Sequence, residues 1–184
     1  MKKSLYLLAM AGSLVLAALP LNASAQQQRL SPHETISTVV GGDRVMIVYG
    51  RPYTKKPNTD VVRKIWGGLI PYGKVWRMGA DEATLLVAQK AIKLGDTTLP
   101  AGAYTLFLLP LEDGTAKLII SKQIGQWGEE YSESDDAARV DLTKSTLDTP
   151  VNQFTMAITK AAGSGTIKLS WENTAYSVAF TPAP

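Results

Sequence analysis

Residues 35–49 read TISTVVGGDRVMIVY, and this stretch decides the fold class. Residues 35–40 and 44–49 are rich in β-branched and apolar side chains with a period of about two, which is typical of strands. Gly41, Gly42 and Asp43 separate the two runs. A glycine-rich turn between two such runs predicts a β-hairpin.

The same pattern continues along most of the chain. Further strands are predicted at residues 84–89, 91–94, 97–99, 103–109, 116–121, 154–159, 166–171 and 175–180. Residues 103–109, AYTLFLL, are apolar on both faces and predict a central strand. No window has a helical stripe, apart from a single helical turn at residues 135–140. We therefore expect one all-β domain over residues 35–184, a jelly-roll-like β-sandwich, with a closed barrel as the alternative.

Residues 1–25 have a different pattern, MKKSLYLLAMAGSLVLAALPLNASA. Lys2 and Lys3 precede an apolar stretch, and Ala23-Ser24-Ala25 offers small residues for cleavage, which together predict a secretory signal peptide. A membrane anchor is the alternative, but the apolar stretch is shorter than the roughly 20 residues that a spanning helix needs. We expect cleavage after Ala25, a tail over residues 26–34, and a periplasmic or secreted protein with no membrane span.

Composition excludes several classes of protein. The chain has 184 residues, no cysteine, one histidine and a net charge of +3. The lack of cysteine excludes disulfides, thiolate metal sites and a cysteine nucleophile, and a single histidine excludes a multi-histidine metal site. Two positive charges belong to the predicted signal peptide, so a nucleic-acid partner is not expected. We predict no catalytic residue, no metal and no cofactor, and an enzyme is the less favoured class.

Residues 49–84 depart from the strand pattern and carry most of the positive charge. They read YGRPYTKKPNTDVVRKIWGGLIPYGKVWRMGADEAT, with a net charge of +4, while residues 129–141 have a net charge of −5. Long irregular loops on a β scaffold often carry function, and arginine grips carboxylates and phosphates with two parallel hydrogen bonds. We predict an anionic or carbohydrate small ligand, or an envelope protein, as the partner of this long basic loop. The predicted binding residues are Arg51, Tyr53, Arg63, Tyr72, Lys74, Trp76, Arg77 and Glu82.

Other interpretations of these charges remain open. Arg77 and Glu82 pair with each other or with Asp136 if the basic and acidic segments simply pack together. A carbohydrate-active or other envelope hydrolase would use Glu82 with a second carboxylate, and a purely structural envelope module would need neither. The lone His33 is expected to be an exposed or loosely packed residue at the start of the fold. The less favoured alternative is a transition-metal site that His33 forms with carboxylates.

Several strings in the chain carry a family resemblance. They are residues 49–52 (YGRP), 63–65 (RKI), 68–77 (GLIPYGKVWR), 79–84 (GADEAT), 99–107 (LPAGAYTLF), 127–128 (WG) and 169–172 (LSWE). Together they resemble the bacterial "domain of unknown function 2911" family over about residues 31–180. The chain departs from the family pattern at Asp81, where asparagine is usual, and in an apparent insertion at residues 55–62. The resemblance implies a secreted or periplasmic bacterial β protein and no assigned activity.

Overall fold

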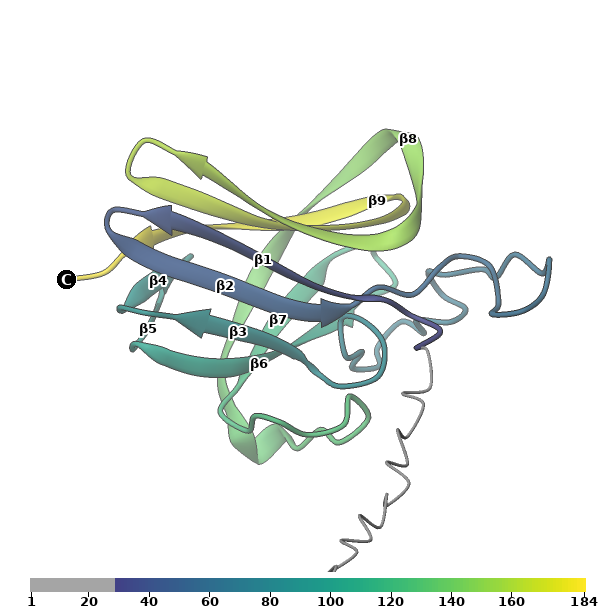
Figure 1. The fold of residues 1–184 in the computed structure, drawn as a ribbon, viewed down its shortest axis with the longest axis horizontal. Coiled ribbons are helices and arrows are strands. Elements are labelled where there is room, and N and C mark those ends of the chain that lie inside the picture. The colour runs from purple at the N-terminus through teal and green to yellow at the C-terminus, as the bar shows by residue number, and fades with distance from the viewer. Residues whose placement is uncertain (1–28) are drawn as a thin grey trace, which may run out of the picture.

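The computed structural model describes residues 29–184 of the chain (Figure 1). The predicted signal peptide lies outside the described residues. Within residues 29–184 the protein is all-β, as predicted, and its helical content is one short 3-10 turn, η1 (Glu133–Asp135). This described part has no helix of the length and apolarity needed to cross a membrane.

Nine antiparallel strands make up the sheet of the described residues. They are β1 (His33–Val40), β2 (Asp43–Gly50), β3 (Thr84–Ala88), β4 (Ile92–Leu94), β5 (Thr97–Leu99), β6 (Gly102–Pro110), β7 (Ala116–Ser121), β8 (Asp136–Ala161) and β9 (Ser164–Pro182). Their hydrogen-bonded order is β1-β2-β3-β6-β7-β8-β9-β4-β5. The jelly-roll-like sandwich stays a prediction, because the strands follow one another in a single continuous order.

The predicted hairpin is present as β1 and β2. Ile36 lies opposite Ile47, and His33 lies opposite Gly50. The turn uses two glycines with positive φ, Gly41 at 58° and Gly42 at 80°, a conformation that side chains other than glycine adopt at a cost. Because β2 alternates, every second side chain from its start faces the core, and the hairpin fixes which residues of β1 lie beside the end of β2.

Strands β8 and β9 are longer than the sequence predicted. Three short strands were expected near the C-terminus, whereas the structure has two long ones that pair from Thr143 opposite Ser177 to Ala161 opposite Ser164. The predicted helical turn at residues 135–140 is wrong beyond Asp135, because residues 136–140 pair with β7 instead. The β8–β9 hairpin curves over β1 and β2 in Figure 1.

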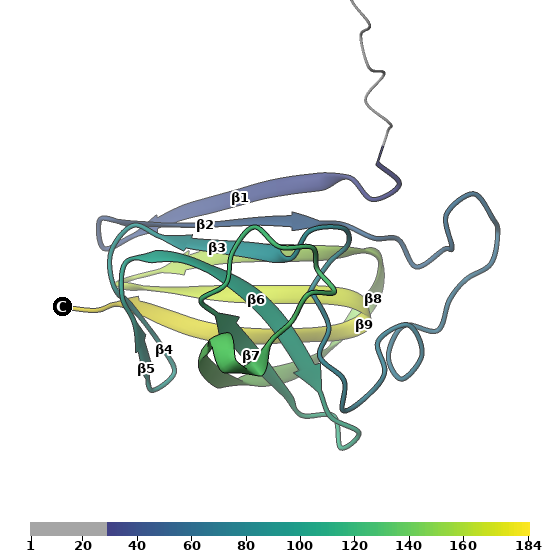
Figure 2. The same ribbon diagram turned by 90° about the horizontal axis from the view of Figure 1, so that it is seen from below.

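The core lies between this curved hairpin and the strands below it. Phe107, Phe154, Trp171 and Phe180, all expected in the core, are 0–1% exposed. The irregular segment between Gly50 and Thr84 leaves the sheet at the end opposite the C-terminus (Figure 2). The sheet therefore supports, at one of its ends, the irregular segment that was predicted to be functional.

Candidate functional site

Residues 51–83, here called the basic segment, follow a path that is pinned to the sheet by backbone hydrogen bonds. Thr54 N donates to Asn152 O at 2.7 Å, and Phe154 N donates to Pro52 O at 2.9 Å. Further along, Trp76 and Leu108 exchange both backbone hydrogen bonds at 2.8 Å. Fixed at both ends in this way, an irregular segment can hold side chains in defined positions without being a strand.

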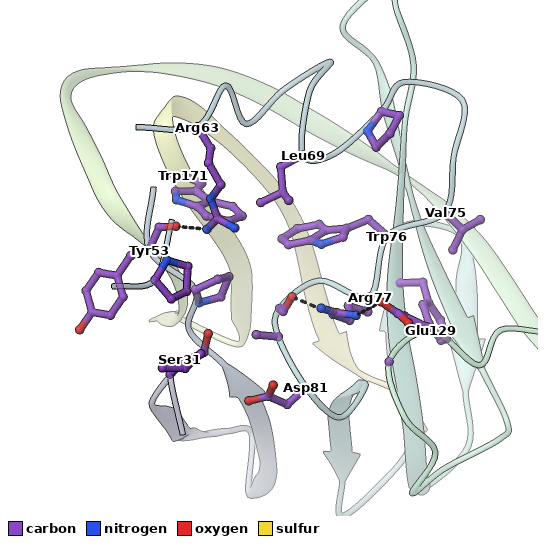
Figure 3. A pocket seen from close by; sticks show the side chains of 18 of the residues that line it. Ser31, Tyr53, Arg63, Leu69, Val75, Trp76, Arg77, Asp81, Glu129 and Trp171 are labelled. Carbon is purple, nitrogen blue, oxygen red and sulfur yellow. Dashed lines mark hydrogen bonds and ion pairs between the residues drawn. The ribbon is translucent and has the colours of Figure 1, made fainter. Parts of the chain in front are cut away.

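A cavity of about 550 Å³ lies between the basic segment and the end of the sheet. Figure 3 shows Trp76 near its middle, with Arg63 on the Tyr53 side and Arg77 on the Glu129 side. Side chains that face it include Leu30, Ser31, Tyr53, Arg63, Leu69, Trp76, Arg77, Asp81, Phe107, Glu129, Tyr131 and Trp171. Apolar walls with a few charged groups at this volume are typical of small-molecule sites.

The aromatic floor of this cavity joins the basic segment to β8 and β9. The rings of Trp76 and Trp171 stack with centroids 5.8 Å apart, and Trp76 meets Phe154 edge-on at 5.0 Å. Trp171 Nε1 donates to Thr54 Oγ1 at 3.2 Å, and Trp66 Nε1 donates to Trp171 O at 3.2 Å. These contacts leave little freedom for Trp76, so its indole offers a preformed apolar surface.

Arg63 carries a positive charge that no carboxylate within residues 29–184 neutralises by direct contact. Its guanidinium donates instead to the backbone oxygens of Tyr53 and Thr54. Partial burial lowers the pKa of Arg63, because desolvation disfavours the charged form. Carbonyl oxygens accept hydrogen bonds but carry no net charge, so the positive charge of Arg63 itself is left for a bound anion to offset.

The charge of Arg77 is neutralised by Glu129, which belongs to residues 129–141, here called the acidic segment. Its Nη1 lies 2.8 Å from Glu129 Oε1, and its Nε donates to Gly79 O at 3.3 Å. The expected packing of basic on acidic residues therefore occurs at this pair. Asp136, the other candidate partner, instead pairs with Arg139 at 2.8 Å within its own segment.

The remaining predicted binding residues do not line the cavity. Arg51 Nη1 lies 3.1 Å from Glu34 Oε2, and its other nitrogens donate to Phe154 O and Thr155 Oγ1. Tyr72 and Lys74 are exposed on the outer side of the basic segment. Of the predicted set, the structure brings Tyr53, Arg63, Trp76 and Arg77 together at the cavity.

Glu82 belongs to a second cluster beside the cavity, formed with Arg29, His33 and Asp81. The Arg29 guanidinium pairs with both carboxylate oxygens of Glu82. His33 Nε2 lies 3.3 Å from Asp81 Oδ2 and 3.4 Å from Glu82 Oε2. His33 is exposed and is the first residue of β1, as expected, but its place in this cluster was not predicted.

The register of the β1–β2 hairpin is the sequence signal that could have identified His33 as part of this cluster. It places His33 opposite Gly50, and Gly50 packs against the backbone of Ala80, one residue before Asp81. That second contact is not visible in the sequence pattern. Trp171 and Tyr131 were likewise missed as cavity residues, because they are far from the basic segment in sequence.

The pKa of Glu82 is lowered to about 2, chiefly by the hydrogen bond from Arg29. An Arg29→Ala change is expected to return this pKa toward 4.5, measurable by NMR titration of the Glu82 carboxyl carbon. Because the folded-state pKa is depressed, the pair stabilises the protein above about pH 4.5 and loses this contribution as the pH falls to about 2. A Glu82 pKa that stays near 2 in the variant would contradict this account.

Together the fold and the cavity define an all-β protein with an aromatic pocket, lined by arginines and carboxylates, at one end of its sheet. The chain belongs to the family described as protein of unknown function (DUF2911), whose model matches residues 31–180. The resemblance seen in the sequence motifs is thereby confirmed. No curated protein and no solved structure matches the chain.

Proposed function

We propose that this is an exported, periplasmic or secreted protein that binds a small organic anion in the cavity of the basic segment. Residues 1–25 support export through their signal-peptide pattern. Arg63 carries the proposal of an anionic ligand, because its charge at the cavity wall is met by carbonyl oxygens alone among residues 29–184. Acidic sugars are the class of ligand to examine first.

The shape and lining of the cavity suit such a ligand. A volume of about 550 Å³ lies within the range of roughly 300–1,000 Å³ typical of small-molecule sites. The face of Trp76 offers a flat apolar surface for a ring, and Arg63 offers a guanidinium fork for a carboxylate or sulfate. Glu129 pairs with Arg77, and Asp81 lies beside Arg29 and His33. Arg63 is therefore the lining arginine whose charge a single negative charge on the ligand would offset.

The geometry favours binding over hydrolysis through Glu82. Glu82 is not among the residues that face the cavity, and Arg29 holds its pKa at about 2. A general acid needs a raised pKa in order to donate a proton near neutral pH. An envelope protein that docks on the basic segment is the alternative partner. It predicts that none of the small anions in the experiment below binds in the cavity.

Replacing Arg63 with methionine is expected to weaken binding of an acidic sugar by about 10- to 100-fold, the loss typical of a charge-assisted hydrogen bond. Methionine keeps much of the apolar stem and removes the charge. Isothermal titration of glucuronate and of sulfated monosaccharides into both proteins measures the change, with neutral glucose as the reference ligand.

The matched control is Lys64→Met, which removes the same charge from an exposed side chain next in sequence that does not line the cavity. It is expected to leave the affinity within about twofold, because exposed charges are screened by solvent and salt. Equal loss in both variants would point to a nonspecific effect of net charge. Absence of anion binding to the wild-type protein would overturn the proposal.

A further inference from the structure

Three side chains of the second cluster present metal-ligating atoms to one another. His33 comes from the first residue of β1, while Asp81 and Glu82 lie just before β3. One nitrogen of His33 and one oxygen from each carboxylate lie within 4.8 Å of one another. An imidazole with two carboxylates is a donor set that Zn²⁺ and similar divalent cations accept.

The two separations from His33 match those between ligands on a single ion, and the three atoms together lie within 4.8 Å of one another. Zinc binds nitrogen and oxygen at about 2.0–2.1 Å in tetrahedral sites, which puts two ligand atoms about 3.3–3.4 Å apart. His33 Nε2 lies 3.3 Å from Asp81 Oδ2 and 3.4 Å from Glu82 Oε2. The contact with Asp81 is a long hydrogen bond, and both separations also agree with atoms that share one cation.

A second observation is that the chain places a cationic side chain, the guanidinium of Arg29, among these three groups. Arg29 Nη1 lies 2.9 Å from His33 Nε2 and 3.8 Å from Asp81 Oδ2, and it also pairs with Glu82 Oε2. One nitrogen therefore contacts all three ligating groups. A guanidinium only donates hydrogen bonds and a carboxylate only accepts them, so Nε2 accepts from Arg29 in one tautomer of His33 and donates to Asp81 in the other. In the first tautomer the lone pair of Nε2 is available to an ion.

The backbone around the cluster is tightly packed. A Cβ on Gly50 would lie 3.0 Å from His33 Nε2 and 2.2 Å from Ala80 O, so only glycine lets the imidazole and the residues before Asp81 approach this closely. The side chains of His33, Asp81 and Glu82 are 25%, 30% and 43% exposed, so an ion from solvent can reach them. A site with this packing loses little side-chain entropy when an ion binds.

We propose that His33, Asp81 and Glu82 form a zinc site in which the Arg29 guanidinium occupies the position of the ion and is displaced when zinc binds. Zinc neutralises both carboxylates, as Arg29 otherwise does in part. Asp81 also faces the cavity, so the ion lies at the cavity's edge. A water molecule or an anionic group of a cavity ligand supplies the fourth ligand. The zinc site does not depend on the anion-binding proposal.

The test is calorimetric titration of zinc chloride into chelator-treated protein that carries no histidine tag. Arg29→Ala is expected to bind zinc about tenfold or more tightly than the wild-type protein, because a competing charged donor is gone. The double variant His33→Ala/Asp81→Asn is expected to lose at least about 100-fold in affinity, because two of three ligands are removed. Zinc is also expected to raise the melting temperature of the Arg29→Ala protein.

The control for nonspecific binding to carboxylates is Glu130→Gln, at an exposed residue of the acidic segment, which is expected to bind zinc as the wild-type protein does. Circular dichroism of each variant shows whether it retains the β fold. Equal zinc affinity in the Arg29→Ala protein and the folded double variant overturns the proposal. So does a melting temperature of the Arg29→Ala protein that zinc leaves unchanged.

Discussion

Replacing Trp171 with alanine is expected to lower the free energy of unfolding by about 3–5 kcal/mol, the range typical of a fully buried large aromatic side chain. Trp171 is 0% exposed and lies in β9 beneath the cavity. Its ring contacts Trp76 and Phe154 at centroid distances of 5.8 and 5.7 Å. Alanine would leave a void that these rigid neighbours cannot fill.

The change also removes a link between two parts of the chain. Trp171 Nε1 donates to Thr54 Oγ1, so its loss releases a hydrogen bond that holds the basic segment against β9. Urea denaturation followed by circular dichroism measures the stability. Trp127→Ala is the matched control, because Trp127 is 46% exposed and its replacement is expected to cost less than about 1 kcal/mol. Equal losses in the two variants would contradict the placement of Trp171 in the core.

A Gly50→Ala change is expected to destabilise the protein by about 1–3 kcal/mol or more, as overpacking against rigid atoms does. The new Cβ would lie 2.2 Å from Ala80 O, and a backbone oxygen cannot rotate away. Thermal and urea denaturation measure the loss of stability. Because His33 Nε2 lies 3.0 Å from the same Cβ position, the variant is also expected to lose zinc binding.

Gly102→Ala provides the comparison for this change. It lies in β6 without a positive φ, and its added Cβ would meet Tyr104 at an ordinary 3.5 Å. We expect a change in stability within about 0.5 kcal/mol, as for other unstrained substitutions. A loss of stability at Gly50 that is no larger than at Gly102 would mean that the end of β2 does not pack tightly against residues 79–82.

The sequence predicts most strands well because each buries one face of its own. In β2, Val45, Ile47 and Tyr49 alternate with more exposed residues, and this alternation is visible without knowledge of the partner strand. Residues 141–153 of β8 were missed, because they are mostly exposed and polar. They are strand because they pair with neighbouring strands, which local composition does not record.

The candidate site was likewise only partly predictable from the sequence. Arginine and aromatic residues are concentrated in one segment, and two of them, Arg63 and Trp76, line the same cavity. Its charges gave no means of telling which arginine meets a carboxylate. Arg77 pairs with Glu129 and Arg51 with Glu34, and both partners are brought there by strand order and hairpin register. Contacts between residues that are far apart in sequence can be predicted only when the order and pairing of the strands are known.

The strand order has a consequence for the timing of folding. β9, the last strand of the chain, pairs with β8 on one side and with β4 on the other, where Leu94 lies opposite Phe180. β4 and β5 thus join the sheet through residues near position 180. A chain that emerges N-terminus first cannot complete this sheet until residues 180–182 are free to pair with β4, and such distant pairings form slowly, in about milliseconds to seconds. Such a delay is compatible with the export that we propose, because the topology itself postpones a compact state.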